Sequence, residues 1–442
     1  MNIPSLRHQL GRIRQAAMLR EEGEVIQVVG LVVEAYARGG VVGDTYEILP
    51  SAHAPPILAE VVGFRDERVL LMPVDALRGV GAGCRVRRRG GLAAVAVGEK
   101  LLGRVIDPLG RPLDDRGTVH VTDRVPLHQP PIPPLRRRPI DTILTLGIRS
   151  IDGLLTLGRG QRVGIFAGAG IGKSTLIGTM ARSARVDVSV IALIGERGRE
   201  VGDFVRRILG PDGLARSVVV VATSDRSPLE QVRGAFAATA IAEWLRDRGA
   251  NVLLVMDSLT RFAMAQRQIG LAIGEPPTTK GYTPSVFALL PRLLERVAPS
   301  DTNGSITGLY TVLVEGDDMS DPVADAARSV LDGHIVMSRE LAEQGHHPAI
   351  DVLASVSRVM SDVVSPAHLV LAQRIRSLIA TAREAQDLVN LGAYVAGSNP
   401  RIDEALKVKP ALDRVLRQRP DESSTLEETL RLFEQALTEP GS

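Results

Sequence analysis

The stretch AGAGIGKST, residues 167–175, decides the fold of this chain. It follows an apolar run at residues 163–166 and precedes a helix-like run that begins at Leu176. A buried strand, a glycine-rich turn and a helix in this order are the setting in which a phosphate loop forms. Glycines let the backbone wrap closely around phosphate oxygens because no Cβ atom blocks the approach, and the N–H groups at the helix start attract the anion. The stretch therefore predicts a nucleotide site.

The end of the loop carries the two side chains that a bound nucleotide needs most. Lys173 supplies a charge that reaches the β and γ phosphates, and Ser174 offers a hydroxyl to Mg²⁺. One position departs from the strict pattern, because Ala167 stands where the pattern opens with glycine. A chance glycine-rich turn is the alternative, and the run Gly-Lys-Ser-Thr argues against it. The residues expected to cradle ATP are Gly168, Ala169, Gly170, Ile171, Gly172, Lys173, Ser174 and Thr175.

Composition excludes several classes of protein. The chain has 442 residues, enough for two or three domains, with 44% hydrophobic and 24% charged residues, as in globular proteins. Its net charge of +2 argues against bulk nucleic-acid binding. The single cysteine, Cys84, excludes an internal disulfide and fits a reducing compartment. No apolar run reaches the ~18 residues of a membrane helix, and the N-terminus lacks the apolar core of a signal peptide. A cytoplasmic location is therefore expected.

The chain divides into four predicted segments. Residues 1–23 form a basic amphipathic helix, which can dock on a partner, lie on an anionic membrane or pack on its own protein. Residues 24–91 hold short β-rich runs separated by turn signals, which predicts a small β-barrel. Residues 92–365 combine a Pro-rich connector with apolar runs that alternate with helical patterns, which predicts an α/β domain around a parallel sheet. Residues 366–442 have a helical apolar rhythm with capping signals at Asn399 and Thr425.

Two carboxylates follow apolar strands of the α/β domain. Its predicted strands are residues 162–166, 188–194, 217–223, 251–256 and 306–314. Asp257 ends one strand and would lie beside the phosphate loop, where it would hold Mg²⁺. Glu196 follows another strand, where a carboxylate can polarise a water for attack on the γ phosphate, and Arg197 could meet phosphate oxygens. The alternatives are an acidic helix cap for Asp257 and a surface turn of mutually paired charges for Glu196 and Arg197.

Longer motifs resemble those of a known family. The run GERGREV at residues 195–201 resembles the catalytic-glutamate motif of the rotary ATPase β-subunit superfamily. Within it, the runs DSLTRFAMAQR at 257–267 and GEPPTTKGY at 274–282 resemble the type III secretion and flagellar export ATPases, over residues 25 to 410. The resemblance implies a RecA-like P-loop NTPase core between the β-barrel and a C-terminal helical domain.

The resemblance also implies roles for individual residues. Glu196 takes the position of the catalytic base, and Arg197 and Arg261 those of phosphate-site arginines. Arg358, in the run SVSR at 355–358, matches the arginine finger that reaches the nucleotide of a neighbouring subunit, which requires a homohexameric ring. Tyr394 falls where the superfamily stacks an aromatic ring on adenine. From the residues alone, a structural ion pair would be preferred for Arg358.

The activity implied is hydrolysis of MgATP by a type III secretion ATPase that releases chaperones and unfolds substrates for export. Its expected place is the cytoplasmic face of the bacterial inner membrane, with peripheral contact to that membrane. The implied partners are a stator protein, a central stalk protein, the export gate and chaperone–substrate complexes. The shared motifs leave the flagellar export ATPase open as an alternative.

Two further classes of protein also carry a phosphate loop. A non-catalytic ring subunit would keep the phosphate loop but lack the carboxylate at Glu196. An RNA translocase would need basic and aromatic residues interleaved in the N-terminal domain, and residues 24–90 offer only Tyr36, Tyr46 and Phe64 as aromatics. Binding of nucleic acid is therefore not expected.

Overall fold

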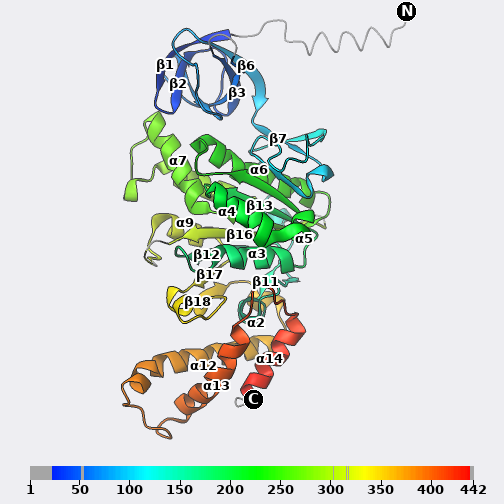
Figure 1. Ribbon diagram of the computed structural model, residues 1–442, viewed down its shortest axis with the longest axis vertical. Coiled ribbons are helices and arrows are strands. Elements are labelled where there is room, and N and C mark those ends of the chain that lie inside the picture. Colours follow the sequence, from blue (N-terminus) through cyan, green and yellow to red (C-terminus); the bar gives the residue numbers. More distant parts are fainter. Residues whose placement is uncertain (1–21, 51–53, 302, 315, 317, 439–442) are drawn as a thin grey trace, which may run out of the picture. The chain divides into compact units, whose positions relative to one another are not determined.

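The computed structural model describes residues 22–50, 54–301, 303–314, 316 and 318–438 (Figure 1). The chain forms two compact units. The first holds the N-terminal β-barrel with the short segments Ser227–Glu230 and Gln268–Pro276, and the second holds the remaining residues from Ala94 onward. Residues 1–21 of the predicted amphipathic helix lie outside the described residues, and its last two positions already belong to strand β1 (Glu22–Val29).

The first unit contains a closed barrel with the strand order β1-β2-β5-β4-β3-β6, which confirms the predicted β-barrel. The β-rich stretch at residues 24–34 forms two strands, because Gly30 turns the chain with φ 57° between them. A strand of mixed polarity, β3, was missed. The barrel strands are β1, β2 (Val32–Tyr36), β3 (Asp44–Leu49), β4 (Ile57–Arg65), β5 (Arg68–Pro73) and β6 (Arg85–Leu92).

The second unit is built on an eight-stranded sheet with the order β18-β17-β12-β16-β15-β13-β14-β8. All neighbours are parallel except β17 and β18, so the expectation of a parallel sheet is wrong at this edge. Every residue of β13 and β14 is buried, as expected for strands covered on both faces. The strands are β8 (Arg104–Ile106), β12 (Arg162–Ala167), β13 (Val188–Ile194), β14 (Ser217–Ala222), β15 (Asn251–Asp257), β16 (Ser305–Leu313), β17 (Gly333–Met337) and β18 (Ile350–Ser357).

The helices of the sheet domain alternate with these strands. They are α2 (Arg149–Leu154), α3 (Lys173–Ser183), α4 (Gly198–Asp203), η3 (Phe204–Leu209), α5 (Gly210–Ala215), α6 (Pro228–Arg246), α7 (Leu259–Ile273), α8 (Pro284–Leu294), α9 (Pro322–Val330), α10 (Arg339–Glu343) and α11 (Met360–Val363). The unit also contains three short 3-10 turns and two two-stranded pairs. The turns are η1 (Glu99–Leu101), η2 (Pro134–Arg136) and η4 (Thr279–Gly281). The pairs are β7 (Ala94–Val97) with β9 (Asp123–Pro126) and β10 (Ile143–Leu144) with β11 (Leu157–Gly158).

Three helices end the chain: α12 (Pro366–Asn390), α13 (Pro400–Leu416) and α14 (Leu426–Thr438). Their predicted caps are confirmed, since the Asn399 side chain accepts from the N–H of Arg401 and Thr425 forms a reciprocal pair with Glu428. The helices pack against one another and against α2, where a Cβ atom on Gly153 would lie 2.5 Å from the Phe433 ring. No helix of the described part is long and apolar enough to cross a membrane.

Candidate functional site

The loop between β12 and α3 adopts the expected phosphate-loop conformation. Gly170 and Gly172 have φ values of 81° and 89°, and no atom would lie within 4 Å of a Cβ placed on either. Glycine is therefore required there by the backbone and not by crowding. Ala167 is instead the buried last residue of β12 and is not among the described residues with positive φ, so the strand tolerates its methyl group.

The structure brings three of the predicted residues together at the carboxyl ends of the strands. Lys173, the first residue of α3, places Nζ 2.5 Å from Asp257 Oδ1 and 3.8 Å from Glu196 Oε1. Asp257 ends β15, and Glu196 follows β13, the strand paired with β15. The loop and both carboxylates thus form one site, as the strand order requires.

A fourth residue, Thr311, joins this site without having been predicted from the sequence. It lies on β16, which separates the strand of the phosphate loop from that of Asp257. Its fully buried hydroxyl donates to Asp257 Oδ1 at 2.7 Å, the same oxygen that Lys173 approaches. This hydroxyl helps to fix the orientation of the carboxylate. The only signal in the sequence is a threonine within an apolar strand, which is too common to single out.

Glu196 lies in an environment that disfavours its charge. Burial first, and then the neighbouring charge of Asp257, raise the pKa of Glu196 to about 7, against the opposing effect of Lys173. Gly195 positions it, because φ there is 69° and a Cβ atom would lie 2.7 Å from Cβ of Arg261. A carboxyl group with a pKa near neutrality is suited to accept a proton from water.

The predicted arginines occupy different places. Arg261 lies on α7 and packs against Gly195, next to Glu196. Arg197 precedes α4 with an exposed side chain, whose guanidinium lies 3.7 Å from Glu200.

Arg358 is at the opposite edge of the sheet from the phosphate loop. Ser357, at the end of β18, pairs with Gly333 at the start of β17, and the Arg358 N–H donates to Asp332 O. The phosphate loop follows the other end of β12, which runs parallel to β17. The exposed guanidinium of Arg358 makes no hydrogen bond or ion pair with any described residue. The structural ion pair considered above is therefore not seen in the described part of the chain.

An apolar pocket of about 260 Å³ adjoins the phosphate loop. The α3 side of its wall includes Ile171, Thr175 and Thr179, and the other side includes Pro348 and Pro420. Tyr394 does not line this pocket, and its contact with adenine stays a prediction. Its hydroxyl bonds instead to Asn399 O and Asp403, in the turn between α12 and α13. No motif marks the segment around Pro420, because the fold alone brings it to the loop.

Oxygen donors suited to Mg²⁺ are present at the loop. Ser174 exposes its hydroxyl in the first turn of α3, and the Asp257 carboxylate lies beside Lys173. Hydroxyl, carboxylate and phosphate oxygens are the ligands that Mg²⁺ prefers. Among the described residues no cluster of three or more His, Cys, Asp or Glu forms a separate metal site. The residues therefore fit a metal held jointly with a nucleotide.

Family models match along most of the chain. Residues 25–90 match the β-barrel domain of the ATP synthase alpha/beta family, and residues 147–357 match the nucleotide-binding domain of the same family. Residues 364–435 match the T3SS EscN ATPase C-terminal domain.

Individual proteins agree with these models. The chain is 52% identical to a flagellum-specific ATP synthase of Pseudomonas aeruginosa, covering 92% of this chain and 91% of the relative. It is 51% identical to a type 3 secretion system ATPase of Xanthomonas euvesicatoria, covering 94% of each. The structure of the assembled ATPase EscN from the enteropathogenic E. coli type III secretion system superposes with a TM-score of 0.90 at 44% identity, covering 94% of this chain and 100% of the other. A structure of EscN with its central stalk EscO gives a TM-score of 0.87 at 43% identity and the same coverage.

Proposed function

The chain belongs to the ATP synthase alpha/beta family, among the flagellum-specific ATP synthases and type 3 secretion system ATPases, and from this premise we propose how its site hydrolyses MgATP for protein export. The observation that carries the proposal is the meeting of Lys173, Asp257 and Glu196 beside an open glycine loop. Phosphoryl transfer to water needs a positive charge for the phosphates, a carboxylate for the metal and a group that accepts a proton from water. The third part is supplied by a carboxyl group with a pKa near neutrality.

The triphosphate lies on the loop from Gly168 to Thr175, and the base enters the apolar pocket between Pro348 and Pro420. Apolar walls suit a flat aromatic base, because they bury its faces without leaving polar groups unpaired. Without nucleotide, the Lys173 ammonium is neutralised by Asp257. On binding, Lys173 exchanges this carboxylate for phosphate oxygens, which leaves Asp257 available to the metal.

Hydrolysis is carried by positioning and charge. Glu196 orients the attacking water and accepts its proton, while Lys173 and Arg261 stabilise the charge that develops on the phosphate oxygens. Arg197 is exposed and would turn toward the γ phosphate when nucleotide is bound. Ser174 and Asp257 would hold Mg²⁺ together with the phosphates, and the metal would supply charge neutralisation.

Arg358 completes the site of a neighbouring subunit. Its guanidinium is exposed and lies at the edge of the sheet away from its own phosphate loop, so it serves a nucleotide only across an interface. A finger acting in trans needs a closed ring, and we propose a homohexamer. The similarity to the assembled ATPase EscN supports this assembly.

In the cell we propose a type III secretion ATPase at the cytoplasmic face of the inner membrane, where it releases chaperones and unfolds substrates at the export gate. The similarity to EscN bound to its stalk EscO supports a central stalk protein as partner. A stator protein or the membrane surface would meet residues 1–21, which lie outside the described residues. Flagellar export is the second candidate, favoured by the 52% identity to a flagellum-specific ATP synthase.

Purification of the tagged chain from its native cell separates the two candidates. Recovery of needle-complex proteins supports secretion, and recovery of flagellar basal-body proteins supports flagellar export. A Lys173→Ala chain serves as the control. Partners whose recovery differs between this chain and the wild type depend on ATP turnover, and partners recovered equally with both do not. Failure of the wild-type chain to hydrolyse ATP at any protein concentration would contradict the proposed chemistry.

A further inference from the structure

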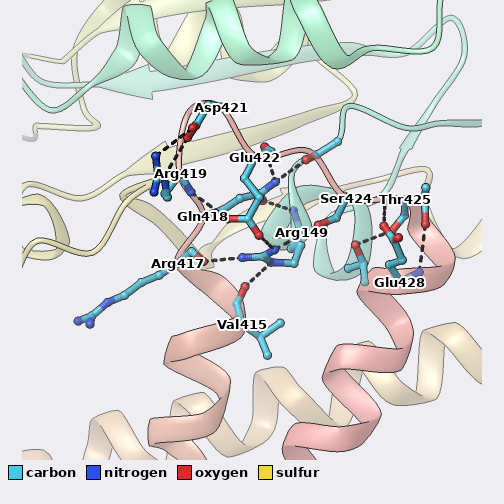
Figure 2. Close-up of polar contacts among 12 residues, drawn as sticks. Arg149, Val415, Arg417, Gln418, Arg419, Asp421, Glu422, Ser424, Thr425 and Glu428 are labelled. Carbon is cyan, nitrogen blue, oxygen red and sulfur yellow. Dashed lines mark hydrogen bonds and ion pairs between the residues drawn. The ribbon is translucent and has the colours of Figure 1, made fainter.

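Arg149 is a buried arginine at the start of α2 that the proposed chemistry does not use. It contacts the α13–α14 loop (residues 417–425), which joins the last two helices (Figure 2). Its Nε donates to Val415 O at 2.7 Å and its Nη2 to Arg417 O at 2.6 Å. Its Nη1 bonds to Glu422 and, at 3.2 Å, to Ser424 Oγ. One planar guanidinium therefore fixes both ends of this loop to the sheet domain.

The same loop forms one wall of the pocket proposed for the base. Gln418, Arg419 and Pro420 line that pocket together with residues of the phosphate loop and α3. Pro420 O accepts from Arg182 at 2.8 Å and from Thr179 at 3.4 Å, both on α3. The position of Pro420 is thus set from one side by the helix that begins at Lys173 and from the other side by Arg149.

Gln418 connects Arg149 to the remaining wall of the pocket. Its Oε1 accepts from the Arg149 N–H at 2.9 Å, and its Nε2 donates to Gly147 O at 2.7 Å and to Glu422 O at 3.0 Å. Its own N–H donates to His347 O at 2.8 Å, next to Pro348. The amide of Gln418 is therefore fully engaged in holding the loop, so it serves to shape the pocket and not to read the edges of a base.

We propose that Arg149 is a positioning residue for nucleotide affinity: it holds the α13–α14 loop against the base pocket, so that the pocket recognises the base of ATP by shape. The proposal rests on the proposed function, because it needs the base to lie in this pocket. Arg149 touches neither the phosphates nor the reacting water. Its loss should weaken the contribution of the base to the affinity for ATP and leave the contribution of the phosphates unchanged.

The test compares MgATP with inorganic tripolyphosphate, which has the phosphates but no base. Dissociation constants are measured by calorimetry for the wild-type chain, Arg149→Gln and Arg149→Lys. Arg149→Gln should weaken MgATP by about tenfold, the effect of about one lost contact, and tripolyphosphate by less than about twofold. Arg149→Lys should lie in between, since an ammonium cannot serve Val415 O, Arg417 O and Glu422 together. In turnover, KM for ATP should rise while kcat stays within about twofold.

Arg417→Gln is the matched control. It removes a guanidinium from the same loop, but Arg149 uses only the backbone carbonyl of Arg417, and the exposed Arg417 side chain points away from Arg149 in Figure 2. This variant should bind both ligands as the wild type does. If Arg149→Gln fails to fold, Glu422→Gln removes only the ion pair and should show the same selective loss, smaller in size.

The outcomes distinguish a wrong role for Arg149 from a wrong location for the base pocket. If wild type prefers MgATP over tripolyphosphate but Arg149→Gln keeps that preference, the role of Arg149 is wrong and the base pocket stands. Equal weakening of both ligands would also overturn it, because Arg149 would then support only the fold. If the wild-type chain binds MgATP no more tightly than tripolyphosphate, the base adds nothing to binding. The proposed base pocket is then wrong, and the proposed role of Arg149 is wrong with it.

Discussion

The carboxyl group of Glu196 is held near the point of half-ionisation by neighbours that act in opposite directions. Burial and the charge of Asp257 raise its pKa to about 7, while Lys173 acts against them. The Glu196→Gln variant keeps the size and removes the base. We expect hydrolysis to fall by about 10²- to 10⁴-fold, the usual contribution of a general base, while the dissociation constant for MgATP changes little. Single-turnover hydrolysis and nucleotide binding measure the two quantities.

Glu404→Gln is the control for that variant. Glu404 lies on α13, where its exposed carboxylate pairs with Arg374 at 3.0 Å, so its neutralisation should change turnover by less than about threefold. Normal turnover by Glu196→Gln would show that another group orients the water.

The raised pKa of Glu196 also predicts a pH dependence. Its carboxylate is the active form, and below the pKa of about 7 the group is protonated and cannot accept a proton from water. The value of kcat/KM, which reports the free enzyme, should therefore rise by about tenfold between pH 6 and pH 8. The dissociation constant for MgATP is the internal reference and should change far less. A value of kcat/KM that stays level over this interval would mean that Glu196 is fully ionised.

Single residues differ in how far the sequence predicts them. Lys173 and Asp257 are predictable because a motif fixes the first and the end of an apolar strand fixes the second. Thr311 and Arg149 are not, because their roles arise from contacts with residues distant in the sequence, Asp257 for Thr311 and the α13–α14 loop for Arg149. The adenine role of Tyr394 stays a prediction, because the structure shows only its bonds within the turn between α12 and α13.

Among the secondary-structure elements, β12 to β16 were predicted because each is an apolar run buried on both faces. The strands β8 and β18, which are the two edges of the sheet, and their inner neighbour β17 were missed. β8 is only three residues long, β17 begins with Gly333 and His334, and β18 contains Asp351, Ser355 and Ser357. β17 and β18 are only partly buried along their length, and β8 is very short, so none of the three shows the long apolar run of a strand covered on both faces. The antiparallel direction of β18 nevertheless decides which edge of the sheet carries Arg358.

The capping box at the start of α14 predicts how much one side chain stabilises the first turn of this helix. Thr425 Oγ1 accepts from the Glu428 N–H at 3.2 Å, and Glu428 accepts from the Thr425 N–H at 2.9 Å. Thr425→Ala removes the first bond and should weaken the helix start by about 1 kcal/mol. The backbone amides of the first turn of α14 should then exchange hydrogen about fivefold faster. Thr425→Ser retains the hydroxyl and should exchange as the wild type does, and equal rates in both variants would show that the cap contributes nothing.

For the whole molecule, the separation of Arg358 from its own phosphate loop means that one chain does not contain a complete site. An arginine finger contributes about 10³- to 10⁵-fold in rate. A chain that lacks Lys173 can still lend Arg358 to its neighbour, and a chain that lacks Arg358 can still hold a nucleotide. The two defects therefore lie on opposite sides of an interface.

Mixing Lys173→Ala chains with Arg358→Ala chains tests this arrangement. Each homogeneous assembly should be inactive, whereas mixed rings form some interfaces in which an intact phosphate loop faces an intact Arg358, so turnover should partly return. Recovery should be greatest near equal amounts of the two chains and should be absent when both substitutions are on the same chain, which is the control. Steady-state ATPase activity, measured on mixed rings whose composition is verified by mass spectrometry, gives the readout. If such rings form and stay inactive at every ratio, Arg358 does not act across the interface, and its exposed position at the end of β18 needs another explanation.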